Sequence, residues 1–435
     1  LTEAMQGIGS TIQITRSEVE RRSNPEAGDG LPVFNDPQLI AWLGEQESSH
    51  RYVLYEADAE LTPWTRRCIR QADRVLLVAN AGADPSPGAI DEEISIAGSR
   101  PDIELLLVHP ESTERPTGTV RWLKQRALQA HHHLRLGDDA QIRHVARLIT
   151  GTALGLAFGG GGARGAAHLG IVQALSERGI EVDLLGGTSM GALMGGRLAT
   201  GLTAAEVTER LSDVVANQGI LDLTLPIVGL TSGASVNSIL VGEFASLRIE
   251  DLWRPFFCVS TNLTRADAII HRSGSLWTAV RASISIPGVF PPVISGNGDL
   301  LVDGGIMNNL PIDLVRQSRG IGTVIGSSVA PDRELEDDFR YGSTASGWRL
   351  ALSRLPGFGP RINAPSILST LMRSNDVRGV ALARTAEFAA QADLIVQSPV
   401  EDFPTLDFTR SAELAEIGYR AANEAFEEWD GIDDL

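Results

Sequence analysis

The sequence is poor in cysteine and has no long apolar run. Its 435 residues include only two cysteines, Cys68 and Cys258, which are too few for a disulfide framework and show no metal-ligand spacing. We therefore expect a reducing compartment, no metal site and no cofactor. No stretch of about 18 apolar residues is free of charges and glycine clusters, so we expect no transmembrane helix.

Lysine is almost absent, and the charge balance is strongly acidic. Lys124 is the only lysine among 37 basic residues, and the formal net charge is -18. A nucleic-acid-binding protein would show a basic face, so this class is excluded. Residues 401–435 hold 11 acids and two arginines, about half of the net charge. Contact with an anionic membrane should therefore depend on apolar surface and local arginines.

Alternating strand and helix patterns predict an α/β fold with a smaller domain at residues 1–150. Within it we expect strands at 52–57, 74–80 and 103–110, a loop at 18–31, and a helix that opens at Asp36 and Pro37. We interpret residues 120–149 as one amphipathic helix, with His131, His132 and His133 at a solvated helix end. This domain shows no P-loop, and Asp58, Glu60, Arg66, Arg67 and Arg70 suggest a solvated charged face.

A second α/β domain is predicted at residues 151–330, followed by an extension at 331–435 that completes it and ends in an acidic helix. Its expected strands cover residues 155–158, 183–188, 256–261, 268–273, 300–305 and 323–329, with a later strand at 394–397. Helical patterns lie between several of these strands, which is typical of a sheet covered by helices.

A glycine loop, GGGGARG, follows the first strand of this domain and precedes a helical pattern. Gly160, Gly162 and Gly165 fit G-x-G-x-x-G. Such a loop aims backbone N–H groups at negative charge. Three interpretations stay open: a dinucleotide site with Glu181 or Asp183 as the ribose-binding acid, an oxyanion hole, or a tight turn.

The sequence GTSMG, residues 187–191, fits G-x-S-x-G between an apolar strand and a helix. This context is what a nucleophile elbow requires, with Ser189 at the apex and Gly187, Met190 and Gly191 around it. The alternative is a glycine-rich turn with a serine N-cap. A serine nucleophile also needs a base.

No histidine stands in a suitable position to be that base. The last histidine is His271, and His168 precedes the serine in a helix where we expect a core or surface role. Asp303 remains, at the end of an apolar strand and before Gly304 and Gly305. Open α/β sheets place their sites at such strand ends. The alternative is an aspartate that forms a turn.

The ordered set GGGARG, GTSMG and DGG resembles the patatin-like phospholipase family. The segments FFCVSTNLTRAD (256–267), SISIPGVFPPV (283–293) and DGGIMNNLP (303–311), together with residues 52–80, resemble its neuropathy target esterase branch. The resemblance covers roughly residues 45–430. It implies a three-layer α/β/α catalytic domain and a smaller α/β domain before it.

By this resemblance, Ser189 is the nucleophile and Asp303 the proton acceptor of a Ser–Asp dyad. The N–H groups of Gly160, Gly161, Gly162, Ala163, Arg164 and Gly165 would form the oxyanion hole. The substrate would be a phospholipid or lysophospholipid, hydrolysed without a metal, at the cytoplasmic face of a membrane or in the cytoplasm. Family members commonly carry cyclic-nucleotide-binding domains and a membrane anchor; neither is expected within these 435 residues.

Residues 219–230 (GILDLTLPIVGL) are unusually apolar for a segment with glycine and proline. We interpret them as a lid or a membrane-contact segment, with buried core as the alternative. Two other classes of function stay open: an oxidoreductase built on Gly160, Gly162 and Gly165, and a non-catalytic binding module at residues 1–150.

Overall fold

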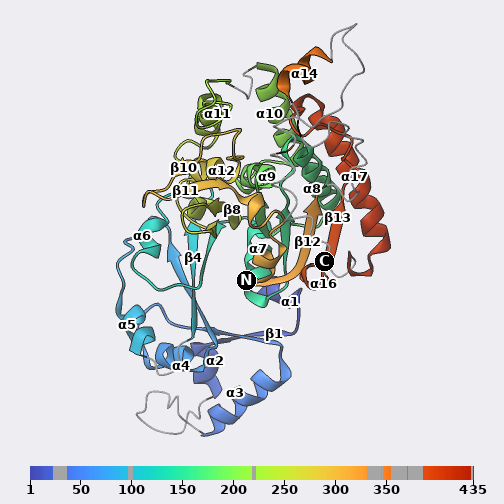
Figure 1. The fold of residues 1–435 in the computed structure, drawn as a ribbon. Helices are drawn as coiled ribbons and strands as arrows, with labels where there is room; N and C mark the ends of the chain where they lie inside the picture. The colour runs from blue at the N-terminus through green and yellow to red at the C-terminus, as the bar shows by residue number, and fades with distance from the viewer. Residues whose placement is uncertain are drawn as a thin grey trace. The chain divides into compact units, whose positions relative to one another are not determined.

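The computed structural model describes residues 1–22, 37–96, 101–217, 222–330, 344, 346–353, 370, 386–432 and 435. The chain divides into two compact units (Figure 1). Unit 1 comprises Leu1–Leu154, Glu250–Pro255 and Gln317–Gly322, and unit 2 comprises the rest. The α/β fold class is confirmed, because both units combine parallel strands with helices.

Unit 1 contains two small parallel sheets, β1-β2 and β3-β4-β5. Its strands are β1 Thr11–Thr15, β2 Tyr52–Glu56, β3 Arg74–Asn80, β4 Asp102–His109 and β5 Ala130–Arg135. Its helices are α1 Thr2–Gln6, α2 Arg16–Arg22, α3 Pro37–Ser49, α4 Pro63–Gln71, α5 Ala89–Ile96, α6 Val120–Leu123 and α7 Asp139–Thr150. The helix predicted to open at Asp36 and Pro37 begins at Pro37, while Asp36 lies outside the described residues.

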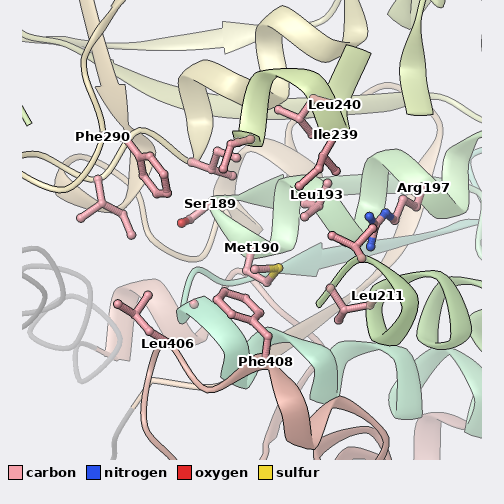
Figure 2. A pocket seen from close by; sticks show the side chains of 15 residues that line it. Ser189, Met190, Leu193, Arg197, Leu211, Ile239, Leu240, Phe290, Leu406 and Phe408 are labelled. Atoms are coloured by element: carbon pink, nitrogen blue, oxygen red, sulfur yellow. The ribbon is translucent and has the colours of Figure 1, made fainter. Parts of the chain in front are cut away.

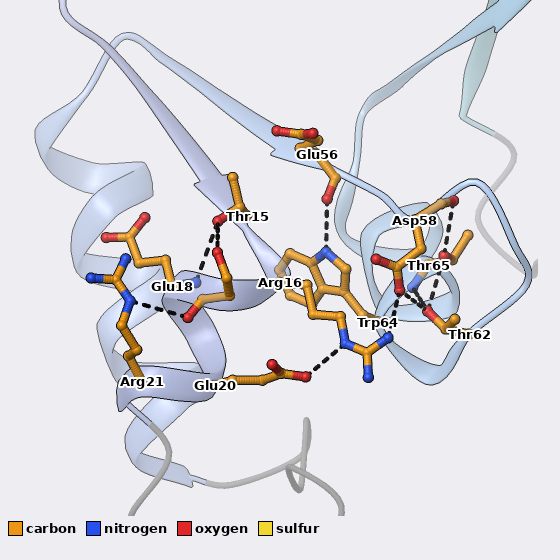
Figure 3. Close-up of polar contacts among 11 residues, drawn as sticks. Thr15, Arg16, Glu18, Glu20, Arg21, Glu56, Asp58, Thr62, Trp64 and Thr65 are labelled. Atoms are coloured by element: carbon orange, nitrogen blue, oxygen red, sulfur yellow. Dashed lines mark hydrogen bonds and ion pairs between the residues drawn. The ribbon is translucent and has the colours of Figure 1, made fainter.

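Side chains from β1, α2, α3 and α4 form one core of unit 1, which includes Ile14, Leu43 and Trp64. Figure 3 shows how polar contacts hold these elements. Trp64 Nε1 donates to the carbonyl of Glu56 at 2.8 Å, and the Arg16 guanidinium lies 3.1 Å from an Asp58 carboxylate oxygen. Asp58 also accepts from the hydroxyl of Thr62, the N-cap of α4. It therefore joins α2 to the start of α4, a role beyond the solvated face expected for it.

Three sequence predictions for unit 1 are wrong. Residues 18–22 belong to helix α2, whereas a loop was expected; residues 23–31 lie outside the described residues. Residues 120–149 form α6, β5 and most of α7, where we expected a single helix. The three histidines lie in β5, and His132 and His133 are buried. The reason is tertiary: His132 Nε2 contacts Glu104 at 2.8 Å, and His133 Nε2 donates to the carbonyl of Glu250 at 2.9 Å.

Unit 2 is built on an eight-stranded mixed sheet in the order β10-β11-β8-β7-β6-β12-β13, with β9 also paired to β8. Its strands are β6 Ala153–Phe158, β7 Leu184–Thr188, β8 Phe256–Asn262, β9 Asp267–His271, β10 Val293–Ile294, β11 Leu300–Asp303, β12 Ile321–Ser328 and β13 Leu394–Gln397. Strands were predicted at all of these positions except β10. The strand β7 pairs with β6 on one side and with β8 on the other, so the residues that follow β7 lie near the centre of the sheet's carboxyl edge.

The helices of unit 2 are α8 Ala167–Glu177, α9 Met190–Ala199, α10 Ala204–Asn217, α11 Ala234–Phe244, α12 Leu276–Ser283, α13 Ile312–Arg316, α14 Gly347–Leu352, α16 Ala386–Ala389 and α17 Ser411–Glu428. The acidic C-terminal helix α17 packs along α8, as Figure 1 also shows. The packing is close because a Cβ at Gly170 or at Gly418 would collide with the backbone of the other helix. Residues 411–428 are thus an integral part of unit 2.

Candidate active site

The nucleophile elbow lies between β7 and α9. Ser189 has a φ of 56° and a ψ of -122°, a strained conformation for a non-glycine residue. The turn needs glycine at Gly187 and Gly191, because a Cβ at the first would collide with the backbone of the second, and a Cβ at the second with Phe158. The backbone thus holds the Ser189 side chain at the apex, at the N-terminus of α9.

Ser189 and Asp303 form a hydrogen-bonded pair, although they are 114 residues apart in the chain. Ser189 Oγ donates to Asp303 Oδ2 at 2.5 Å. Asp303 ends β11 and is fully buried, and Ser189 is 6% exposed. The N–H of Gly305 donates to Asp303 Oδ1 at 2.8 Å, which orients the carboxylate so that Oδ2 faces the serine. This is the geometry of a nucleophile and its base.

Gly304 allows the end of β11 to approach the neighbouring strand. A Cβ there would collide with the carbonyl of Val259 and lie 3.0 Å from the Thr188 side chain. The two glycines that follow Asp303 therefore have different roles. Gly304 permits close packing, and Gly305 supplies the N–H that holds Oδ1 of the carboxylate.

The glycine loop lies against the elbow. A Cβ at Gly160 would be 3.1 Å from the Ser189 Cβ, and a Cβ at Gly165 would collide with the Met190 side chain. This proximity favours the oxyanion-hole interpretation over a dinucleotide site, because the loop's backbone is placed beside the serine.

The structure narrows the six residues expected to supply oxyanion donors. The N–H of Gly160 donates to the carbonyl of Asn309 at 3.0 Å, and that of Ala163 donates to the carbonyl of Thr405 at 2.7 Å. Both N–H groups are thus engaged elsewhere, contrary to expectation. Arg164 and Gly165 lie inside the 3₁₀ helix η1 Gly162–Ala166.

Gly161 and Gly162 remain as candidate donors from this set. Within the described part of the chain, their N–H groups form no hydrogen bond with another backbone carbonyl. Gly162 has a φ of +58° and lines the pocket beside Ser189. The Arg164 side chain acts elsewhere, because it donates at 2.8 Å to the carbonyls of Glu401 and Phe403 and so ties the C-terminal segment to the loop.

Two further residues support the site and were not singled out from the sequence. Ser283, at the end of α12, accepts from the N–H of Ser189 at 2.9 Å and donates to the carbonyl of Val259 at 2.6 Å. Asn309 supplies the carbonyl that binds Gly160. Both residues lie within segments that carried the family resemblance. The sequence therefore pointed to these segments, but it did not reveal the roles of the two individual residues.

The histidines of unit 2 take structural positions. His168 is fully buried; its Nε2 donates to the carbonyl of Gly159 at 2.8 Å and its Nδ1 contacts Ser327 Oγ at 2.5 Å. Burial lowers the pKa of His168 to about 4, so it is neutral near pH 7 and anchors the start of the glycine loop. Burial likewise lowers the pKa of His271 to about 4; its Nε2 contacts Ser260 Oγ at 2.8 Å.

A largely apolar pocket opens beside Ser189 (Figure 2), with an empty volume of about 720 Å³ that includes its open mouth. Apolar side chains dominate its lining, as in sites that bind small molecules or acyl chains. It is lined by Gly162, Ser189, Met190, Leu193, Arg197, Leu211, Val214, Val236, Ile239, Leu240, Ile284, Ile286, Phe290, Leu406 and Phe408. No group of three or more metal-ligating side chains occurs among the described residues.

The segment expected to be a lid is described at residues 222–230, and residues 223–228 of it are exposed. Leu223, Leu225, Ile227 and Val228 are 80%, 74%, 81% and 65% exposed. The alternative of buried core therefore fails for these four side chains. Residues 219–221 lie outside the described residues.

Two protein-family models match this chain, one in its N-terminal third and one in the middle of the sequence. Residues 156–316 match the patatin-like phospholipase model, and residues 1–153 match the P-loop-like domain model of the neuropathy target esterase family. These two domains, in this order, place the chain in the patatin-like phospholipase family and in its neuropathy target esterase branch.

Individual relatives agree with this membership. Patatin-like phospholipase domain-containing protein 7 of Mus musculus is 36% identical over 99% of this chain and 34% of its own length. Patatin-like phospholipase domain-containing protein 6 of Homo sapiens is 34% identical over 99% and 33%. Neuropathy target esterase sws of Drosophila melanogaster is 32% identical over 98% and 32%. The chain thus spans about a third of the length of these relatives. None of the described helices is long and apolar enough to cross a membrane.

Proposed function

We propose that this chain is a serine esterase that hydrolyses carboxyl esters of phospholipids or lysophospholipids through a Ser189–Asp303 dyad. Membership in a family of lipid ester hydrolases supports the reaction class. The observation that carries the mechanism is the 2.5 Å hydrogen bond from Ser189 Oγ to Asp303 Oδ2, at the edge of an apolar pocket.

In the first step Ser189 Oγ attacks the ester carbonyl carbon while its proton moves to Asp303 Oδ2. The bond between Oγ and the carbonyl carbon forms, and the carbonyl oxygen becomes an oxyanion. The carbon–oxygen ester bond then breaks, and Asp303 returns the proton to the departing alcohol. An acyl-enzyme on Ser189 remains, with its chain in the apolar pocket.

In the second step Asp303 takes a proton from water, whose oxygen attacks the acyl carbon. Collapse of this intermediate breaks the bond to Oγ, and Ser189 recovers the proton as the fatty acid leaves. One aspartate therefore serves as base and acid in both halves of the reaction, and neither a histidine nor a metal enters these steps.

The oxyanion of both intermediates is stabilised by backbone N–H groups, with Gly161 and Gly162 as the proposed donors. Each such donor is worth on the order of 3 kcal/mol in comparable sites. The N-terminus of α9 adds a partial positive charge beside Ser189 Oγ. These fixed dipoles compensate for the weakness of a carboxylate as a base.

The substrate is proposed to enter from a lipid surface that residues 222–230 contact. This segment joins the pocket walls: the N–H of Leu230 donates to the carbonyl of Gly288 at 2.8 Å, beside the lining residue Phe290. Asp222 accepts from the N–H of Ala234 at 2.8 Å, at the start of α11, which also lines the pocket. The exposed apolar side chains of residues 222–230 thus belong to a segment that is hydrogen-bonded to elements lining the pocket. Contact of this segment with the membrane would be peripheral.

Labelling with a fluorophosphonate probe tests the reaction class. We expect covalent labelling at Ser189 and none in Ser189→Ala, whereas a dinucleotide-dependent oxidoreductase would stay unlabelled. Mass spectrometry of products from a panel of lysophospholipids and diacyl phospholipids then identifies the substrate. Release of free fatty acid supports the proposal, and absence of ester cleavage across the panel overturns it.

A further inference from the structure

One face of α9 forms a wall of the acyl pocket from the nucleophile to a buried arginine. Ser189, Met190, Leu193 and Arg197 all line the pocket, and their spacing places them along one side of the helix. At 1.5 Å per residue, the eight steps along the helix from Ser189 to Arg197 span about 12 Å. Figure 2 shows Leu193 between Ser189 and Arg197.

Helix α11 also lines the pocket and repeats this arrangement. Val236, Ile239 and Leu240 line the pocket, and Glu243 follows on the same side of the helix one turn further. On both helices, apolar lining residues are thus followed about one turn later by a charged residue, Arg197 on α9 and Glu243 on α11.

The two charged residues meet. Arg197 Nε lies 2.6 Å from Glu243 Oε1, and Arg197 Nη2 lies 2.8 Å from Glu243 Oε2, a bidentate pair. Arg197 is 1% exposed and the Glu243 side chain 11%. The pair therefore joins α9 to α11 at the end of the pocket remote from Ser189.

One donor of this pair is left over. Arg197 Nη1 is buried and forms no hydrogen bond among the described residues. A buried donor without a partner is costly, and a buried charge more so. An apolar chain end that met this nitrogen could not supply the missing acceptor, so the polar pair offers a hydrocarbon chain no favourable contact at this point.

We propose that the Arg197–Glu243 pair is the end stop of the acyl pocket and sets the length of acyl chain that the enzyme accepts. This rests on the proposed function, because it takes the acyl group to be bound to Ser189 and the chain to run along α9. The carbonyl carbon sits at Ser189, the chain passes Leu193, and its methyl end meets the ion pair. Longer chains must bend back or displace the pair, and lose transition-state binding.

The test compares hydrolysis of p-nitrophenyl esters from butyrate to stearate. The variant Arg197→Met/Glu243→Met replaces both charges with apolar groups of similar size, which avoids leaving either charge buried alone. The measured quantity is the ratio of kcat/KM for long acyl chains to kcat/KM for short ones. We expect this ratio to rise about tenfold, the scale of a few methylene contacts in an apolar pocket.

A second variant keeps the test decisive if the double variant does not fold. Leu193→Phe adds bulk to the pocket between the nucleophile and the stop, and should shift the preferred chain to shorter acyl groups, with the same ratio about tenfold lower. The matched control is Arg420→Met/Glu416→Met, which removes an exposed ion pair on α17. Its chain-length profile should equal that of the unmodified enzyme.

The outcomes separate this inference from the proposed function. Ester hydrolysis with an unchanged chain-length profile in folded Arg197→Met/Glu243→Met would overturn the end stop and leave the esterase standing. An unchanged profile in Leu193→Phe would do the same, because the chain would then not run along α9. Failure of the unmodified enzyme to cleave any ester would overturn both.

Discussion

At the scale of single residues, the site depends on a few hydrogen bonds whose partners are distant in sequence. Ser189 and Asp303 could be singled out from the sequence because each stands in a short motif, GTSMG and DGG, and the structure joins them by a hydrogen bond. The role of Ser283 could not be predicted, because a serine at the end of a helix is common and usually has no functional role. Only the structure shows that its hydroxyl binds the N–H of Ser189.

Ser283→Ala should lower both stability and turnover. The substitution leaves the N–H of Ser189 buried without its acceptor, at a cost of about 1–3 kcal/mol. The strained elbow also loses a restraint, so kcat should fall. Urea unfolding and ester hydrolysis measure the two effects.

The matched control is Ser212→Ala, which removes an exposed hydroxyl that donates to the carbonyl of Thr208 within α10. It should change the free energy of unfolding by less than about 0.5 kcal/mol. Equal behaviour of the two variants would contradict a positioning role for Ser283.

At the scale of elements, strands with apolar runs were predicted well and polar strands were not. The runs at β7, β8 and β11 are short, apolar and bounded by turn residues, which is typical of buried strands. β5 carries three consecutive histidines, which show no apolar periodicity. Its burial is decided by Glu104 on β4 and by the carbonyl of Glu250, both far away in sequence, so no local pattern could have revealed it.

The anchoring of the glycine loop to α8 should be pH-dependent. Burial lowers the pKa of His168 from 6.5 to about 4, so the unfolded chain binds a proton more readily than the folded one between these pH values. The free energy of unfolding should therefore fall as the pH drops from about 6.5 to about 4, by about 3 kcal/mol from this group.

Chemical denaturation of the unmodified chain and of His168→Gln across this pH range measures that dependence. The variant should be less stable near pH 7 and should show a shallower fall, because it lacks the titrating group. Parallel curves for the two proteins would show that another group is responsible.

The exposed segment 222–230 should control contact with lipid. Leu225→Asp/Ile227→Asp places two carboxylates on its apolar tip, where they oppose insertion between lipids. We expect reduced sedimentation with phosphatidylcholine vesicles and retained hydrolysis of a short soluble ester.

The matched comparison is Thr224→Asp/Val241→Asp, which adds the same two negative charges but leaves Leu225 and Ile227 unchanged. It should bind vesicles more strongly than the tip variant. Unchanged vesicle binding by a folded tip variant would remove the membrane role of the segment.

At the scale of the whole molecule, unit 1 includes two segments that come much later in the sequence, Glu250–Pro255 and Gln317–Gly322. Within it, the N–H of Thr119 donates to Asp251 at 3.0 Å and Trp253 Nε1 donates to the carbonyl of Glu114 at 3.0 Å. Glu104 is buried and contacts Arg319 at 2.5 Å. Burial alone would raise the Glu104 pKa, but hydrogen bonds from His132 and Arg319 lower it to about 2.

A chain truncated to residues 152–435 should therefore be less stable than the full chain. Removal of the preceding residues leaves Asp251, Trp253 and Arg319 without these partners and exposes apolar surface. We expect a lower Tm and aggregation on heating, measured by light scattering during a thermal scan. A truncated chain with the Tm of the full chain would show that the two inserted segments need no partner.

The two-unit organisation was only partly predictable, because sequence order suggested consecutive domains. The segments 250–255 and 317–322 belong to unit 1 although they lie between elements of unit 2. Their assignment to unit 1 depends on tertiary contacts with residues that are distant in sequence. The local sequence patterns around Trp253 and Arg319 do not distinguish these segments from neighbouring loops.

The central claim is that a carboxylate, without histidine, activates Ser189. Hydrolysis of a lysophospholipid by folded Asp303→Asn tests it most directly, because the amide is close in shape to the carboxylate but cannot accept the proton. We expect kcat to fall at least about a thousandfold, toward the level of Ser189→Ala. Near-normal turnover by folded Asp303→Asn would show that Asp303 is not the base.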